Sequence, residues 1–247
     1  MIVPMETLSS RQTQLLKVII DEYLTTAEPV GSLVLEKKYP LGVSPATIRN
    51  EMVVLTQKGF LKQPHTSSGR VPTPSAMKFY ISQLMDEKKL SLAQEVQAQE
   101  TFRSKEENVD RLMREAVHSL SEHTNSLAVA TEDSGAIWSH GYAHVFASPE
   151  FSDHLVCQRV FQMVEEARLL HDLMFKRLTG ATPIEVLFGE ELGWEYFEPV
   201  GIVASRFSVG NREYAFGVVG PFRLNYAQVI PTVRYYGSLM QKALNSA

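Results

Sequence analysis

Arg49 and Asn50 are adjacent polar residues whose side chains can hydrogen-bond the edges of nucleic-acid bases. An Arg guanidinium can donate two hydrogen bonds to guanine, and an Asn amide can form two with adenine. Contacts to phosphate, or a structural salt bridge made by Arg49, are the alternatives. Base reading requires that both side chains lie on the exposed face of a helix that fits a DNA groove.

The surrounding residues predict such a helix. Ser44 is a favoured N-cap residue, and Pro45 fits the first helical position, where no N–H is needed. Apolar side chains then recur at helical spacing, at Ile48, Met52 and Leu55. With this stripe facing inward, the outer face of the first turns carries Thr47 together with Arg49 and Asn50.

The segment after this helix is basic and contains no acid. No Asp or Glu occurs from residue 52 through residue 85. Gly59 ends the helix, and residues 60–73 are predicted to form a strand, a polar tip and a return strand, with Gly69 permitting a tight bend. Arg70 suits the minor groove or a phosphate. The DNA-contacting residues expected on the helix and hairpin are Ser44, Thr47, Arg49, Asn50, Lys58, Lys62, His65, Thr66, Ser67, Ser68, Arg70 and Lys78.

Two earlier helices and one later helix complete this region. The first, capped by Ser9 or Ser10, carries an apolar face, and the second follows the turn at residues 28–32 with Leu33 and Leu35 inward. Another helix is predicted for residues 74–85. Three helices followed by a hairpin predict a winged helix-turn-helix domain over residues 1–87 that binds double-stranded DNA. A small helical domain without a nucleic-acid role is the alternative.

The charge is divided unevenly along the chain. The net charge of −4 over 247 residues is unusual for a DNA-binding protein. Residues 1–90 carry 11 Lys and Arg against 8 Asp and Glu, whereas residues 91–247 carry 13 against 20. The basic charge is therefore concentrated in the predicted DNA-binding part. Because it is modest, a few placed contacts, and two half-sites, are expected to give the affinity.

The remainder predicts an α+β domain with a central antiparallel sheet over residues 109–247. A solvent-exposed helical linker is expected over residues 88–108, and a helix from residue 109 ends near His123. The later predictions are strands at 126–131, 137–146, 183–189, 200–209 and 213–219, with helices at 149–178 and 226–244. The turn at 132–135 joins the first two strands.

Other reactive side chains give weaker signals. His140 and His144 are four residues apart on a predicted strand, but no third ligand lies at metal-site spacing, so neither a metal nor a cofactor is expected. Cys157 lies among apolar residues and is expected to be a buried structural thiol. Gly-rich phosphate loops, a Gly-x-Ser-x-Gly motif and a Cys-x-x-Cys pair are absent from the sequence, so no enzyme is expected.

Two further expectations concern environment and ligand. The sequence has no signal peptide and no run of about 18 apolar residues, which predicts a soluble, cytoplasmic protein without membrane contact. Trp138, Tyr142, Phe188 and Phe207 could line a small-ligand pocket, although such aromatic residues are usually part of a core. A metabolite-sensing regulator therefore remains the alternative function.

The chain resembles the heat-inducible transcription repressor HrcA family at both ends. The matching motifs are Leu8–Arg11, Glu28–Ser32, Ser44–Met52, Gln63–Thr73 and Gly220–Tyr226, with further similarity at Pro149–Phe151 and Gly189–Glu191. The resemblance implies a winged-helix domain followed by a GAF-like domain. It also implies a homodimer that binds an inverted-repeat operator, called CIRCE, upstream of chaperone genes, with help from a GroEL-type chaperonin.

One departure from that family is large. Family members carry a dimerising domain inserted within the GAF-like domain, whereas here the turn at 132–135 leads almost directly into the strand from Ile137. The resemblance therefore leaves the dimer contact open. The segment from Glu100 to His123, or the final helix, is expected to pair instead.

Overall fold

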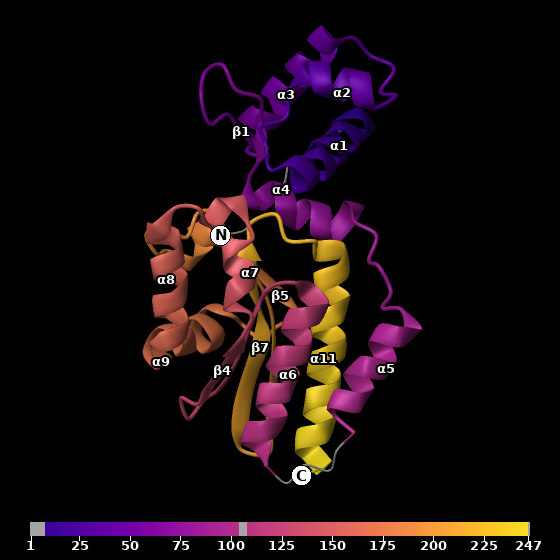
Figure 1. Ribbon diagram of the computed structural model, residues 1–247. Helices are drawn as coiled ribbons and strands as arrows, with labels where there is room; N and C mark the ends of the chain where they lie inside the picture. The colour runs from indigo at the N-terminus through magenta and orange to yellow at the C-terminus, as the bar shows by residue number, and fades with distance from the viewer. Residues whose placement is uncertain (1–7, 104–107, 247) are drawn as a thin grey trace. The chain divides into compact units, whose positions relative to one another are not determined.

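The computed structural model describes residues 8–103 and 108–246, and the chain divides into two compact units (Figure 1). Unit 1 comprises Met1–Asp86 and unit 2 comprises Glu87–Ala247. Each unit has its own buried core. Together they make a mixed α+β protein in which unit 1 is mainly helical and unit 2 is built on an antiparallel sheet.

In its described residues, 8–86, unit 1 contains three helices, a short hairpin and a fourth helix. The elements are α1 (Ser10–Thr26), α2 (Ser32–Lys38), α3 (Pro45–Gln57), β1 (Leu61–Lys62), β2 (Val71–Pro72), α4 (Pro74–Phe79) and the π-helical turn η1 (Tyr80–Leu84). Ser9 caps α1 through a capping box with Gln12, and Ser44 caps α3 as expected from its residue type. The core is formed by the apolar faces of these helices: Leu15, Leu16, Ile19, Ile20, Leu35, Ile48, Met52 and Leu55 are all buried.

The hairpin is joined by a third extended segment. Val30, between α1 and α2, exchanges two backbone hydrogen bonds of 2.9 Å with Arg70. A Cβ added to Gly69 would lie 2.4 Å from the carbonyl carbon and oxygen of Val30. Gly69 does not have a positive φ, so the expected tight bend is not its role. Glycine is required there because two backbone segments touch.

A buried carboxylate ties α1 to α2. Glu22 is 7 % exposed, and it accepts hydrogen bonds from Lys38 Nζ at 2.5 Å and from the Tyr39 hydroxyl at 2.9 Å. The Lys38 hydrogen bond is the main reason that the pKa of Glu22 lies below its ordinary value. Burial, together with the hydrogen bond to Glu22, raises the pKa of Tyr39 to about 12.

Unit 2 is organised by a five-stranded sheet with the order β4-β3-β7-β6-β5, in which all neighbours are antiparallel. The strands are β3 (Leu127–Glu132), β4 (Ile137–His140), β5 (Glu185–Phe188), β6 (Val200–Val209) and β7 (Arg212–Pro221). The long central pair β6–β7 is joined by a tight turn with a positive φ at Gly210. β4 and β5 are the two edge strands.

Helices cover both faces of this sheet. They are α5 (Leu92–Thr101), α6 (Val109–Thr124), α7 (Tyr142–Phe146), η2 (Pro149–Phe151), α8 (His154–Glu165), α9 (Ala167–His171), η3 (Asp172–Arg177), α10 (Gly189–Leu192) and α11 (Tyr226–Ser246). α8, α9 and η3 enclose one core with Leu127, Val129 and Ile202. α6 and α11 pack together against the opposite face, as Figure 1 shows.

Pro231 lies inside α11 and frees a carbonyl that another segment uses. Proline has no N–H to donate to the carbonyl four residues earlier, that of Ala227. The backbone N–H of Lys88 donates to this oxygen at 2.8 Å, and the neighbouring Glu87 pairs with Arg234 through two hydrogen bonds of 2.6 and 2.8 Å. The beginning of unit 2 is thereby fixed to α11.

Several predicted boundaries differ from the structure. The strand expected at 137–146 ends at His140, because Gly141 has a φ of +95° and α7 begins after it. The single helix expected at 149–178 is divided into η2, α8, α9 and η3, and the extended backbone of Glu166 separates α8 from α9.

The stretch expected to be an exposed linker contains α5, which packs on α6 with Ala98 fully buried. The segment from Glu100 to His123 that was expected to pair in a dimer is not one helix: α5 ends at Thr101, α6 begins at Val109, and residues 104–107 lie outside the described residues. Among the helices at residues 8–103 and 108–246, none is both long enough and apolar enough to cross a membrane.

Candidate nucleic-acid interface

The outer face of α3 presents the two residues predicted to read bases. Arg49 and Asn50 are both exposed, while Ile48 and Met52 on the same helix are at most 4 % exposed. Within the described part of the chain, neither outer side chain takes part in a hydrogen bond or ion pair. Both are therefore available to an external ligand.

The helix start is held by its own polar groups. Ser44 Oγ accepts the Thr47 backbone N–H at 3.2 Å, and the two hydroxyl oxygens are 3.1 Å apart. Ser44 and Thr47 therefore stabilise the N-terminus of α3, in addition to the predicted DNA contact. Glu51, one turn further on, accepts a hydrogen bond from Gln12 of α1 and so faces away from the free surface.

The hairpin tip is ordered by internal hydrogen bonds. Ser68 Oγ donates to the carbonyl of His65 at 2.7 Å and accepts the His65 backbone N–H at 3.0 Å. The amide of Gln63 donates to the carbonyls of Thr66 and Ser68. The Ser68 hydroxyl therefore shapes the loop, and the exposed side chains at its tip are those of His65, Thr66 and Ser67.

The predicted cations occupy different positions around the hairpin. Arg70 Nε donates to Thr56 Oγ1 at 3.0 Å, which holds the guanidinium over the end of α3. Lys62 lies on β1 and is half-buried, Lys58 caps the end of α3, and Lys78 is exposed on α4. All three lysines take part in interactions within the chain.

A groove of about 560 Å³ lies between the start of α2, the outer face of α3 and the hairpin tip. It brings together five of the predicted residues, Arg49, Thr66, Ser67, Ser68 and Arg70. The groove is also lined by residues that the sequence reasoning did not assign to it: Leu33, Val34, Val53 and Gln63.

Leu33 corrects the sequence prediction. It was expected to point inward with Leu35, but it is 58 % exposed while Leu35 is fully buried. Residues two positions apart lie on nearly opposite sides of a helix, so these two leucines cannot share one face. That spacing was the signal that one of them belongs to the surface. Val34 and Val53, which are 41 % and 40 % exposed, extend the same apolar strip.

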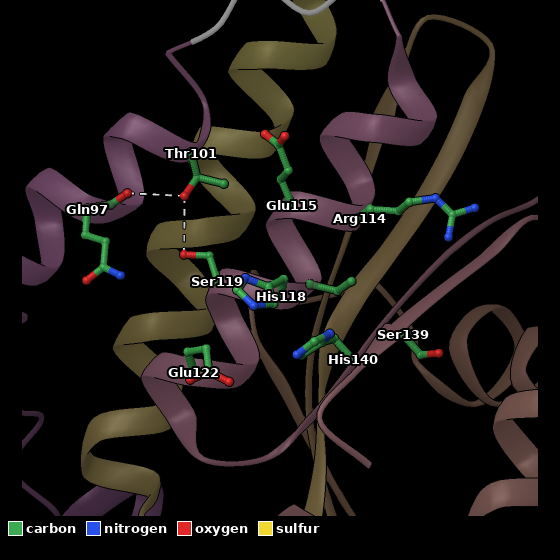
Figure 2. A pocket seen from close by; sticks show the side chains of 10 residues that line it. Gln97, Thr101, Arg114, Glu115, His118, Ser119, Glu122, Ser139 and His140 are labelled. Atoms are coloured by element: carbon green, nitrogen blue, oxygen red, sulfur yellow. Dashed lines mark hydrogen bonds between the residues drawn. The ribbon is translucent and has the colours of Figure 1, made fainter. Parts of the chain in front are cut away.

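Unit 2 has a separate open pocket of about 540 Å³ between α5, α6 and β4 (Figure 2). Thr101 of α5 bridges to Ser119 of α6 at 3.3 Å on one wall. His118 and Glu122 of α6 and His140 of β4 form the floor. Burial, and next the charge of His118, lower the pKa of His140.

The four aromatic residues considered for a ligand pocket do not surround one cavity. Trp138 lies on β4 and Phe188 on β5, which are opposite edges of the sheet. Phe188 packs against Phe222 and Tyr226, and Phe207 stacks on Tyr214. Cys157 is buried, as expected, and burial raises the pKa of its thiol.

The fold first places the chain in a broad class: an α+β protein with a mainly helical unit followed by a unit built on an antiparallel sheet. A solved structure described as a hypothetical protein at 2.2 Å resolution shares the fold, with a TM-score of 0.76 over 97 % of this chain and 99 % of that chain at 17 % sequence identity.

The family model described as the HrcA protein C terminal domain matches residues 49–230. The chain therefore belongs to the HrcA family.

Two curated relatives show how the similarity is distributed. A heat-inducible transcription repressor HrcA of Symbiobacterium thermophilum is 45 % identical over 122 residues, which are 49 % of this chain and 36 % of that protein. The repressor of the same name from Syntrophobacter fumaroxidans is 23 % identical over an alignment of 342 positions that covers 97 % of this chain and 98 % of that protein. The matched region in the first relatives is thus only about a third of their length.

The longer alignment also leaves part of that relative without a counterpart in this chain. It has 342 positions whereas this chain has 247 residues, so at least 95 positions have no counterpart here. In the structure β3 and β4 are joined by a four-residue turn, at the place where the sequence analysis expected an inserted domain to be missing.

Proposed function

We propose that this chain is a transcriptional repressor of heat-shock genes, and that it binds an inverted-repeat, CIRCE-like operator through unit 1. The relatives it resembles carry the name heat-inducible transcription repressor. A repressor of chaperone genes acts on the chromosome, which in bacteria lies in the cytoplasm. The observation that carries the proposal is the exposed pair Arg49 and Asn50 beside an acid-free hairpin.

In this proposal unit 1 is a winged helix-turn-helix domain. α3 is the recognition helix, and its first two turns enter the major groove of DNA. Arg49 donates to guanine and Asn50 pairs with adenine, because their side chains are exposed and make no competing internal bond. Residues 63–70 form the wing.

The wing, the nearby cations and the apolar residues of α2 and α3 are proposed to contribute in two ways. Arg70 and the lysines at 58, 62 and 78 supply positive charge for phosphates, which fixes the register of the protein on the duplex. Leu33, Val34 and Val53 offer apolar surface at the same place. Such side chains suit the thymine methyl group, which is the apolar feature of the major groove.

The experiment uses DNA selected by the protein itself. The full chain is incubated with a pool of random duplexes, and bound duplexes are amplified, sequenced and footprinted. The proposal expects an enriched inverted repeat whose half-sites are about one helical turn apart. The variant R49A/N50A should enrich no common sequence, whereas R168A, at an exposed Arg of α9, should enrich the wild-type repeat. Enrichment of the same repeat by R49A/N50A would refute the recognition surface.

We also propose that the DNA-bound form is a homodimer. The modest charge of residues 1–90 supplies few phosphate contacts for one copy, so a second half-site is needed for selective affinity. Sedimentation of the chain with the selected duplex and with a half-site duplex tests this. Two chains on the full duplex and weaker binding to the half-site are expected. One chain on each, with equal affinity, would contradict the dimer.

In the same proposal, unit 2 is a GAF-like regulatory domain, and its folded fraction sets repression with the help of a GroEL-type chaperonin. A loss of about 1–2 kcal/mol in stability changes the active fraction several-fold. Heat would lower the DNA-binding fraction, and an occupied chaperonin would not restore it. The selected duplex is titrated before and after brief heating, with and without chaperonin and ATP. An active fraction that neither falls nor recovers would refute this control.

A further inference from the structure

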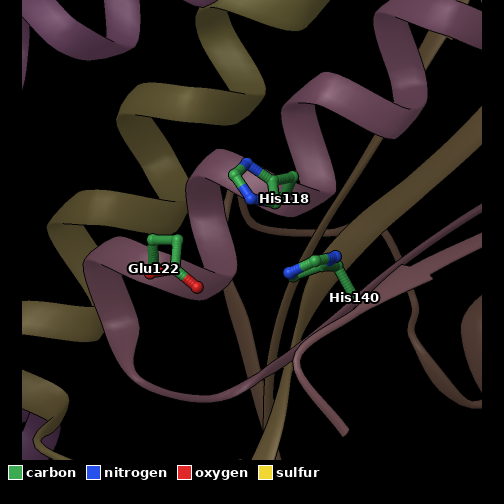
Figure 3. A group of neighbouring side chains, drawn as sticks. All are labelled: His118, Glu122 and His140. Atoms are coloured by element: carbon green, nitrogen blue, oxygen red, sulfur yellow. The ribbon is translucent and has the colours of Figure 1, made fainter.

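We propose that His118, Glu122 and His140 form a site for a divalent transition-metal ion, with Zn²⁺ as the natural probe. The ligand atoms of the three side chains all lie within 4.8 Å of one another (Figure 3). They come from two elements that are distant in sequence, since His118 and Glu122 lie on α6 and His140 lies at the end of β4.

The ligand set is selective for a class of metal. Two imidazoles and one carboxylate are the donors found in zinc sites that keep an open position, and they also suit Ni²⁺ and Cu²⁺. Mg²⁺ and Ca²⁺ require shells made almost wholly of oxygen, so two histidine nitrogens argue against both. Spacing on the helix supports joint binding, because residues four apart on α6 lie one above the other on the same face.

The distances require only a modest contraction. Bond lengths of about 2.0–2.2 Å in a tetrahedral site place neighbouring ligand atoms roughly 3.3–3.5 Å apart. The 4.8 Å spread must therefore close by about 1.3–1.5 Å, a change that rotation of side chains can supply. His118 and Glu122 are exposed and His140 is half-buried, so side-chain rotation is possible without repacking the core.

The two elements that carry the ligands are fixed to one another. The indole N–H of Trp138 on β4 donates to Asp110 of α6 at 2.8 Å. At the other end of β4, a Cβ added to Gly141 would lie 2.0 Å from Ser121 Oγ of α6, so backbone and helix are in direct contact there. These two attachments flank the cluster and hold its scaffold in place, which lowers the cost of assembling the ligands.

The surroundings leave room for an exchangeable ligand. The three side chains lie on the floor of the open pocket of unit 2, so water or a small anion can complete the coordination shell. His144 of α7 places its Nε2 3.8 Å from Glu122 Oε1, where it can orient the carboxylate. The bound ion would join α6 to the edge strand and stabilise unit 2 through binding to its folded form.

The test measures Zn²⁺ itself on the full chain without an affinity tag. After dialysis against a chelator, the protein is titrated with Zn²⁺ in competition with a chromogenic chelator, and Mg²⁺ is the negative control. One equivalent of Zn²⁺ should bind, and H118A should weaken binding by at least about ten-fold. The matched control H154A removes a histidine that is 89 % exposed on α8 and should bind as the wild type does.

A second readout distinguishes this site from adventitious histidine binding. Co²⁺ in place of Zn²⁺ should give visible absorption bands of a four-coordinate ion, and these should disappear in H118A and in H140A. Circular dichroism checks that both variants remain folded. The proposal is overturned if no saturable Zn²⁺ binding occurs. It is equally overturned if both variants retain the wild-type affinity and spectrum.

Discussion

Arg49 of unit 1 differs from three arginines of unit 2 that have partners within the chain. In unit 2, Arg223 pairs with Glu150, Arg206 pairs with Glu213 and donates to the carbonyl of Phe175, and Arg234 pairs with Glu87. In unit 1, Arg49 is exposed and has no partner within the described residues. The net charge of the whole chain hides this division. The affinity for DNA depends on where positive charge is exposed, and the net charge of the chain does not give that distribution.

The comparison predicts that removing Arg223 of unit 2 lowers stability, whereas removing Arg49 of unit 1 lowers DNA affinity and leaves stability unchanged. Arg223 and Glu150 are only 21 % and 14 % exposed, so removal of the cation leaves a carboxylate that is largely shielded from water. Arg223→Met should lower the free energy of unfolding of unit 2 by about 3 kcal/mol. Denaturant unfolding measures this, and the double variant E150Q/R223M should recover part of the loss. A change below about 0.5 kcal/mol would show that the pair is not structural.

The wing depends on backbone contact. Gly69→Ala would bring a Cβ to 2.4 Å from the Val30 carbonyl and should separate Val30 from Arg70. We expect unit 1 to lose about 2–3 kcal/mol of stability because backbone atoms cannot rotate out of the way. Gly31→Ala is the control, since an added Cβ there meets nothing within 4 Å. Equal midpoints of thermal unfolding for the two variants would contradict this account of the wing.

Arg49, the proposed recognition residue, should affect DNA binding and not folding. Arg49→Ala should cost about 1–3 kcal/mol on the selected duplex and relax preference at one base position. Lys78→Ala should weaken all sequences alike and reduce the salt slope by about 1. Fluorescence anisotropy at several salt concentrations separates the two effects. An Arg49→Ala variant that lost affinity equally on all duplexes would make Arg49 a phosphate contact, which is the alternative raised by the sequence.

The buried Glu22 predicts acid sensitivity of unit 1. Its pKa is lowered in the folded state, chiefly by the Lys38 hydrogen bond, so the stabilisation is present above the ordinary carboxyl pKa of 4.5. It is lost as the pH falls through the lower, folded pKa. Glu22→Gln should therefore cost about 1 kcal/mol at pH 7 and show a smaller loss of stability on acidification. If the free energy of unfolding depended on pH identically in the wild type and the variant, this contribution of Glu22 would be ruled out.

The parts of the fold that the sequence could predict are those encoded by near neighbours in the chain. Ser44, Pro45 and Gly59 mark the limits of α3, and the turn at residues 210–212 marks the β6–β7 hairpin. Gly69 was recognised as significant but for the wrong reason, because its contact with Val30 depends on a segment 39 residues earlier. The burial of Glu22 depends likewise on Lys38 and Tyr39 across two helices.

The same limit applies to the candidate sites. His140 and His144 were expected on one strand, but Gly141 follows the end of that strand and His144 lies on α7. In the proposed metal site, His140 is joined by His118 and Glu122 of α6, and His144 is not one of the three ligands. The cluster forms only when the fold brings the edge strand β4 against α6, so spacing along the sequence does not reveal it. Glycine inside the predicted strand was the local signal that the strand would stop.

The central claim is that the DNA surface lies on the outer face of α3 and on the wing. Its most direct test is nuclear magnetic resonance of the isotope-labelled full chain, with backbone and arginine side-chain signals followed as the selected duplex is added. We predict the largest shifts at residues 44–53 and 63–70, with the Arg49 guanidinium signal shifted on the selected duplex and not on a scrambled one. Shifts concentrated in unit 2, with the α3 and wing signals unchanged, would contradict the account.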